Sequence, residues 1–126
     1  MRAALLLIPL LALVASADDE ISVIDFCRDY SLVAKKVMYE RQQKKPMSDT
    51  LLQTIRLIED WAKKYGVEMD SEKAEEGAAT MVLEAYKAPT FPLDSVWREK
   101  RQDEIDSFEN GVFEECYTQA RDALDE

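Results

Sequence analysis

The two cysteines are the residues of this chain best suited to covalent chemistry, and they lie far apart. Cys27 and Cys116 stand near opposite ends of the chain, so they cannot form a CxxC redox pair. In an oxidising compartment this even, minimal count predicts one intramolecular disulfide, with two free buried thiols or an intermolecular bond as alternatives.

Histidine is absent from the sequence, which limits the catalytic chemistry open to the other residues. Ser-His-Asp sites, Cys-His sites and most zinc sites need it. The glycines are isolated, so the chain has no glycine-rich phosphate loop. We therefore expect no catalytic residue, no metal site and no cofactor, and we expect that the protein is not an enzyme.

Carboxylates are the one abundant group with acid–base chemistry, since the chain has 26 Asp and Glu residues. A glycoside hydrolase needs two of them placed across its substrate, but the spacing here singles out no pair. Most acidic residues fall on the polar faces of predicted helices, which is typical of a solvated surface. A carboxylate-based envelope hydrolase remains an alternative function.

Two groups of residues are candidates for binding a partner. The first is a set of cations around the end of the first predicted helix: Lys35, Lys36, Arg41, Lys44 and Lys45. The second is a set of aromatic residues around a proline-containing loop: Tyr86, Phe91 and Trp97. The structural alternatives are salt bridges and a complement to the helix dipole for the cations. For the aromatic residues, the alternative is a lid over one end of the fold.

Residues 1–17 have the features of a secretory signal peptide. Arg2 supplies the positive charge, an apolar run follows, and Ala15-Ser16-Ala17 forms a small-residue cleavage site before an acidic run. The apolar run is shorter than the roughly 20 residues that a membrane span needs. We expect cleavage after Ala17, a periplasmic or secreted protein, and no stable membrane insertion after cleavage.

Residues 18–126 are expected to form a single all-α domain, because their apolar residues recur at intervals of three and four. Four helices are expected, at about residues 21–43, 49–65, 71–88 and 95–124. Ser48 or Asp49, Asp70 and Asp94 are the expected N-caps of the later three helices. Gly66 is the expected left-handed residue after the second helix.

The expected inward faces place both cysteines in the core. Cys27 shares a stripe with Ile24, and Leu52 lies on the inward stripe of the second helix. The stripe of Cys116 stays in phase across Gly111, which favours one long helix there over two. The expected fold is a small four-helix bundle whose first and last helices are linked by a Cys27–Cys116 disulfide.

The net charge of −10 limits the classes of partner. A chain this acidic repels nucleic acid and anionic lipid as a whole. We therefore expect no nucleic-acid partner, and we expect the partner to be an envelope or periplasmic protein.

Short motifs lie over most of the mature chain: a signal peptide, a first cysteine, an "M..RQ" helix end at Met38 to Gln42, an "AY..P" helix stop at Ala85 to Pro89, and a final cysteine. This pattern resembles a group of small secreted proteins found in proteobacteria and in their phages and prophages. The resemblance implies a periplasmic address and a phage setting, and it supplies no catalytic residue.

Export, compactness and the missing catalytic chemistry together predict a non-enzymatic periplasmic protein that binds another envelope protein. In a phage setting, such a protein would inhibit a host enzyme, block superinfection or tune lysis timing. A carrier of a small apolar ligand between the helices is a further alternative, which predicts a buried cavity.

Overall fold

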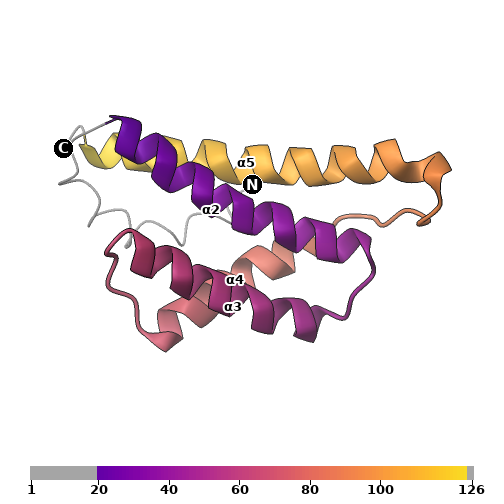
Figure 1. The fold of residues 1–126 in the computed structure, drawn as a ribbon, viewed down its shortest axis with the longest axis horizontal. Coiled ribbons are helices and arrows are strands. Elements are labelled where there is room, and N and C mark those ends of the chain that lie inside the picture. The colour runs from indigo at the N-terminus through magenta and orange to yellow at the C-terminus, as the bar shows by residue number, and fades with distance from the viewer. Residues whose placement is uncertain (1–19, 125–126) are drawn as a thin grey trace.

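The computed structural model describes residues 20–124, so the expected signal peptide lies outside the described part of the chain. Its elements are α2 (Glu20–Gln42), α3 (Met47–Lys64), α4 (Ser71–Ala85), the 3₁₀ turn η3 (Ser95–Trp97) and α5 (Arg98–Leu124). Between residues 20 and 124 there is no strand, and the helices form a bundle (Figure 1). The expected all-α fold with four helices is confirmed.

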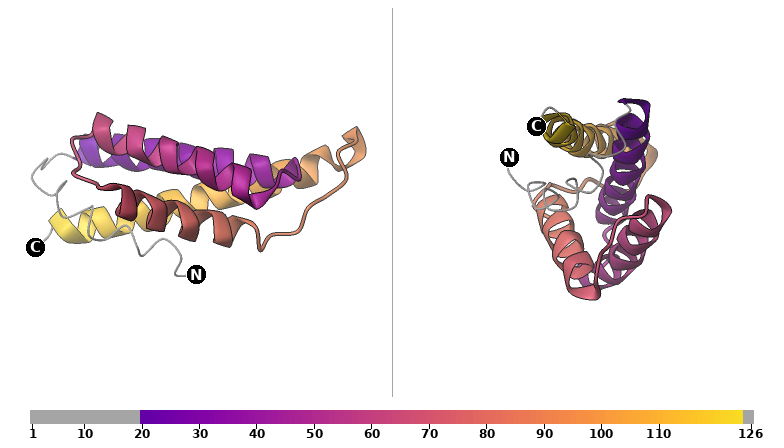
Figure 2. Two further views of the ribbon diagram at one scale, coloured as in Figure 1. Left: turned by 90° about the horizontal axis from the view of Figure 1, so that it is seen from below. Right: turned by 90° about the vertical axis from the view of Figure 1, so that its left-hand side faces the viewer.

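Helix α2 is the centre of the packing, because it contacts each of the other three α-helices. Helices α3 and α4 pair with each other, whereas α5 packs mainly along α2 (Figure 2). The buried apolar residues form one cluster that includes side chains from all four helices. Removing this apolar surface from water, at about 25 cal/mol per Å², is the main favourable contribution to the fold.

A disulfide joins Cys27 of α2 to Cys116 of α5, as expected. The two Cα atoms are 5.6 Å apart, and both side chains are fully buried. The bond closes a loop with a sequence separation of 89 residues, for which the chain-entropy model sets an upper figure of about 4–5 kcal/mol, above the typical 2–4 kcal/mol. The bond fastens α5, the helix that depends most on a single neighbour, to that neighbour, α2.

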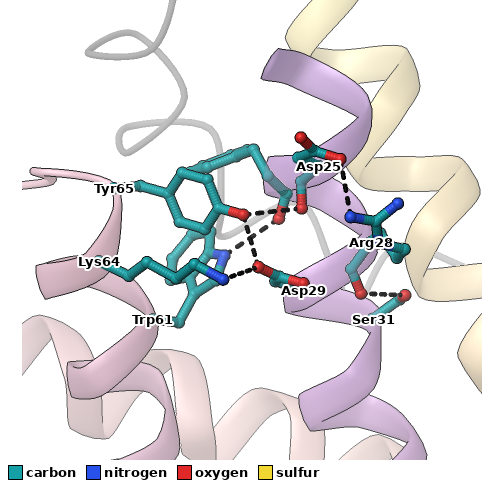
Figure 3. Close-up of polar contacts among 8 residues, drawn as sticks. Asp25, Arg28, Asp29, Ser31, Trp61, Lys64 and Tyr65 are labelled. Carbon is teal, nitrogen blue, oxygen red and sulfur yellow. Dashed lines mark hydrogen bonds and ion pairs between the residues drawn. The ribbon is translucent and has the colours of Figure 1, made fainter. Parts of the chain in front are cut away.

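Polar side chains at the end of α3 hold this helix against the first turns of α2 (Figure 3). The Trp61 indole N–H donates to the Phe26 carbonyl oxygen over 3.1 Å. The Lys64 ammonium (2.7 Å) and the Tyr65 hydroxyl (2.5 Å) both donate to the Asp29 carboxylate. These two hydrogen bonds, that of Lys64 first, hold the pKa of Asp29 below its ordinary value.

Two apolar residues that the periodicity places inward are exposed. Ile24 is 40% exposed and Leu52 is 61% exposed, so both expectations were wrong. On α3, the positions buried instead are Thr50 and Thr54. The Thr50 hydroxyl lies 2.7 Å from the Tyr86 hydroxyl, and the Thr54 hydroxyl donates to the Thr50 carbonyl over 2.7 Å. Because a hydrogen-bonded hydroxyl can be buried at little cost, hydrophobicity alone placed Leu52 inward and missed the two threonines, although Ile58 and Ala62 are buried as expected.

The first turn of α3 also differs from expectation. The helix begins at Met47, directly after Pro46, and no side chain caps it. Ser48 and Asp49, the expected caps, lie inside the first turn because the Pro46 carbonyl already accepts the Asp49 N–H over 3.1 Å. The Asp49 carboxylate still suits this position, since the first turn of a helix favours negative charge.

The caps expected at Asp70 and Asp94 are present. The Asp70 side chain accepts a backbone N–H at the start of α4, and Asp94 does the same for η3, which leads directly into α5. Helix α4 was expected to continue until Pro89, but it ends at Ala85. The residues that follow it form turns and carry the contacts described below.

Left-handed residues end both α2 and α3. Gly66 has a φ of 68°, as expected, and Lys44 has a φ of 64° at the corresponding position after α2. The Lys44 N–H donates to Arg41 O over 2.9 Å, and the Lys45 N–H donates to Glu40 O over 3.1 Å. This is the Schellman pattern, which closes a helix by satisfying two carbonyls of its last turn.

Candidate functional site

The basic residues around the end of α2 surround one buried carboxylate. Glu40 is only 2% exposed, and its carboxylate lies 2.7 Å from the Lys45 ammonium and 3.3 Å from that of Lys36. Burial raises the pKa of Glu40, but the hydrogen bonds and charges of Lys45 and Lys36 outweigh it, so the pKa lies below its ordinary value. A carboxyl group in this state is ionised near neutral pH and is not suited to donating a proton.

Arg41 holds the α4–α5 connection against the end of α2. Its guanidinium donates twice to the Ala88 carbonyl oxygen, over 3.0 Å from Nε and 2.7 Å from Nη2, and stacks 5.0 Å from the centre of the Tyr86 ring. Beside it, the fully buried Gln42 donates its amide N–H to the Pro89 carbonyl over 2.9 Å. Two residues of α2 therefore satisfy backbone carbonyls of the α4–α5 connection.

Tyr86 completes this junction from the side of α4. Its hydroxyl donates to the Lys45 carbonyl over 2.9 Å and lies 2.7 Å from the Thr50 hydroxyl. The structure thus brings Arg41 and Tyr86, which the sequence placed in two separate patches, into direct contact. The fold therefore uses four of the predicted binding residues for contacts of its own: Lys36, Arg41, Lys45 and Tyr86.

Lys35 and Lys44 differ from the other three cations of the basic patch. Both are exposed, and within residues 20–124 neither forms a salt bridge. Lys44 follows the end of α2 in the left-handed conformation. Lys35 lines an open groove of about 320 Å³ between α2 and α5. The groove is lined by Leu32, Lys35, Lys36, Tyr39, Gln102 and Ile105.

Residues 91–97, here called the tip loop, lead into the start of α5 (Figure 1). They carry exposed apolar side chains. Val96 is 81% exposed, Leu93 is 49% exposed and Trp97 is 36% exposed. The Phe91 and Trp97 rings stack on each other, with centroids 5.7 Å apart and planes 14° from parallel.

The backbone of the tip loop is held in place by two side chains. The Asp94 carboxylate accepts the Val96 N–H over 3.1 Å. From the first turns of α5, the Arg101 guanidinium donates to the Asp94 carbonyl over 2.9 Å and also to the Pro92 carbonyl. The loop therefore presents its apolar side chains from an ordered backbone.

Sequence reasoning singled out Phe91 and Trp97 but missed Val96, Leu32 and Tyr39. Leu32 and Tyr39 are 45% exposed and lie seven residues apart, so they share one face of α2 with the lysines between them. A signal was present: apolar residues at i and i+7 on a helix face that also carries charge. It was not decisive, because single apolar residues on a surface are normal.

Within residues 20–124, no group of three or more His, Cys, Asp or Glu residues is arranged to hold a metal ion. Over the same part of the chain, no helix is both long enough and apolar enough to cross a membrane.

Comparison with known proteins finds no match among family models, curated proteins or solved structures. The resemblance to small secreted proteins of proteobacteria and their phages therefore stays a prediction from short motifs.

Proposed function

We propose that this protein is exported and acts, without catalysing a reaction, by binding another protein of the cell envelope through its tip loop. The observation that carries the proposal is the exposure of Val96 and Leu93 beside the stacked pair of Phe91 and Trp97. Tryptophan is enriched among the residues that dominate binding energy at protein interfaces, and the contacts around such a residue exclude water from it.

The ordered backbone of the tip loop supports binding in addition to its exposed apolar side chains. Asp94 and Arg101 fix its backbone through hydrogen bonds, and the two rings restrict each other. A segment that is already ordered loses less conformational entropy when it binds, so more of the contact energy remains as affinity.

The disulfide supports an oxidising compartment, because such bonds persist outside the reducing cytosol. The expected signal peptide and the resemblance point to the periplasm in particular. An envelope protein is therefore the proposed partner, and in a phage setting the binding would inhibit a host enzyme, block superinfection or tune lysis timing.

The test is site-specific photo-crosslinking in intact cells, with a photoreactive residue replacing Val96. The matched control carries the same residue at Lys63, which is exposed on α3 away from the tip loop. We expect Val96 to yield a reproducible adduct with one envelope protein, and we expect Trp97→Ala to reduce the yield.

Two outcomes would contradict binding through the tip loop. One is that Val96 and Lys63 yield the same adducts; the other is that Val96 yields no adduct although the protein is abundant and folded. Hydrolysis of peptidoglycan by the purified protein without a partner would contradict the non-enzymatic role. That result would favour the carboxylate-based hydrolase.

A further inference from the structure

The groove between α2 and α5 combines apolar walls with positive charge. Leu32 and Tyr39 are each 45% exposed beside it, and Ile105 of α5, which is 6% exposed, lies at its base. Lys35 and Lys36 stand between Leu32 and Tyr39 along α2. One helix face thus carries an apolar residue, two cations and a second apolar residue in order.

The two lysines are not equivalent. Lys36 lies 3.3 Å from the Glu40 carboxylate, and its ammonium is 5.6 Å from the centre of the Tyr39 ring. Lys35 is exposed and has no salt bridge among the described side chains. The groove therefore has one cation that forms no salt bridge within residues 20–124, in a chain of net charge −10.

The shape of the groove suits a macromolecular segment better than a small molecule. Small-ligand sites enclose about 70–90% of the ligand surface, whereas this groove is open along its side. From Leu32 to Tyr39 it follows two turns of α2, or about 10 Å. An amphipathic helix laid into such a groove presents anchor residues at intervals of three, four and seven.

We propose that the α2–α5 groove binds an acidic amphipathic helix of a partner protein. Its apolar anchors would pack on Leu32, Tyr39 and Ile105, and its Asp or Glu side chains would pair with Lys35 and, in part, with Lys36. This inference rests on the proposed function, because it names a second contact surface and the chemistry of the partner.

Charge decides between this occupant and a second copy of the chain. Two copies would bring together molecules of net charge −10 each, which repel each other at low and physiological salt. A partner needs negative charge only on the segment that meets the lysines. Pairing there discriminates against neutral or basic helices and speeds association.

The experiment is a selection of displayed helical peptides of about 20 residues on the oxidised protein, followed by affinity measurements on the enriched peptides. We expect an excess of Asp and Glu on one face and apolar residues spaced by three, four and seven. Leu32→Glu and Lys35→Glu should each weaken binding about tenfold or more.

Two matched controls separate the groove from general changes in surface. Leu52→Glu places the same substitution on α3, at a leucine that is 61% exposed, and Lys63→Glu reverses an exposed lysine of the same helix. Both should leave peptide affinity within about twofold, because neither lines the groove. Circular dichroism checks that all four variants stay helical.

Enrichment of neutral or basic peptides, or equal binding to the Leu32→Glu protein, would overturn the inference. It would also be overturned by a dimer in sedimentation that Leu32→Glu dissociates, since a second copy would then fill the groove. Binding of dodecyl phosphate that competes with every selected peptide would make an anionic amphiphile the occupant instead. None of these results depends on crosslinking from Val96, so this inference and the proposed function can fail separately.

Discussion

Lys44 has the backbone conformation that glycine adopts at the corresponding position after α3. Its φ of 64° is close to the 68° of Gly66. In both cases the next residue donates the second hydrogen bond of the Schellman pattern. A left-handed conformation costs a residue with a Cβ atom about 1–2 kcal/mol. The end of α2 therefore carries local strain that the end of α3 avoids.

We expect Lys44→Gly to stabilise the protein by about 0.5–1 kcal/mol, because relief of strain is partly offset by the greater freedom of glycine in the unfolded chain. Urea denaturation measures the change. Gly66→Ala is the matched reverse substitution and should destabilise by about 1 kcal/mol. Loss of stability in Lys44→Gly would mean that the lysine side chain contributes more than its backbone strain costs.

A second residue-scale prediction concerns the buried carboxylate of Glu40. Its pKa is below the ordinary 4.5 in the folded protein, so its contribution to stability is complete above about pH 4.5 and is lost as pH falls through the folded value. We expect Glu40→Gln to cost about 1–2 kcal/mol at pH 7 and progressively less below pH 4.5. Denaturation curves from pH 7 to pH 3 test this, with the exposed Glu75→Gln as the control.

Asp29 should add a further acid dependence to the stability, because its pKa is also lowered by its hydrogen bonds to Lys64 and Tyr65. A Glu40→Gln protein whose stability loss is the same at pH 7 and pH 3 would contradict the assigned role of the two lysines.

At the scale of elements, α5 is a single helix of 27 residues that continues through Gly111. The expectation of one helix is confirmed. Gly111 is exposed, and an added Cβ atom would meet nothing within 4 Å. Glycine inside a helix costs about 0.8–1.0 kcal/mol relative to alanine, and no close approach at this position compensates for it.

Gly111→Ala should therefore stabilise the protein by about 0.8–1 kcal/mol, measured by urea denaturation. The exposed neighbour Asn110→Ala should give a smaller gain, since asparagine is a better helix former than glycine. No gain at Gly111 would indicate that α5 needs to bend there in solution.

The α4–α5 connection is held in part by Arg41 of α2. Arg41 donates two hydrogen bonds to the Ala88 carbonyl, and lysine cannot reproduce this planar geometry. We expect Arg41→Lys to cost about 1 kcal/mol and to speed amide hydrogen exchange in residues 86–97. Arg56→Lys, on the exposed face of α3, should change neither quantity.

For the whole molecule, the disulfide acts on α5, the helix that depends most on a single neighbour. Helix α5 packs mainly on α2, whereas α2, α3 and α4 also support one another. Cys27 and Cys116 join α5 to this group near the C-terminal half of α5. The order in which parts of the fold open should reflect this asymmetry.

Reduction of the disulfide should destabilise the protein by about 2–4 kcal/mol and expose α5 first. Limited trypsin digestion with and without reductant tests this. Early cleavage at the basic residues of α5 (Arg98, Lys100 and Arg101 in its first turns) is expected only after reduction. Simultaneous cleavage throughout α3 and α4 would show instead that the bundle unfolds as one unit.

The sequence by itself determined the features that depend on near neighbours along the chain. Helical periodicity predicted the four helices, Asp70 and Asp94 were identified as caps, and Gly66 as a left-handed end. Both cysteines were placed inward correctly because their apolar stripes have a 3.6-residue period. These signals are local, so they can be read without knowing which helices meet.

Only the tertiary structure decided which faces meet and which surface residues remain free. Arg41 and Gln42 donate hydrogen bonds to carbonyls 47 residues away in the sequence. Thr50 is buried because the Tyr86 hydroxyl is its hydrogen-bond partner. The α2–α5 groove exists because Ile105 of α5 packs beside the exposed Leu32 and Tyr39 of α2. Such contacts arise from the packing of distant segments, which residue spacing along one helix does not encode.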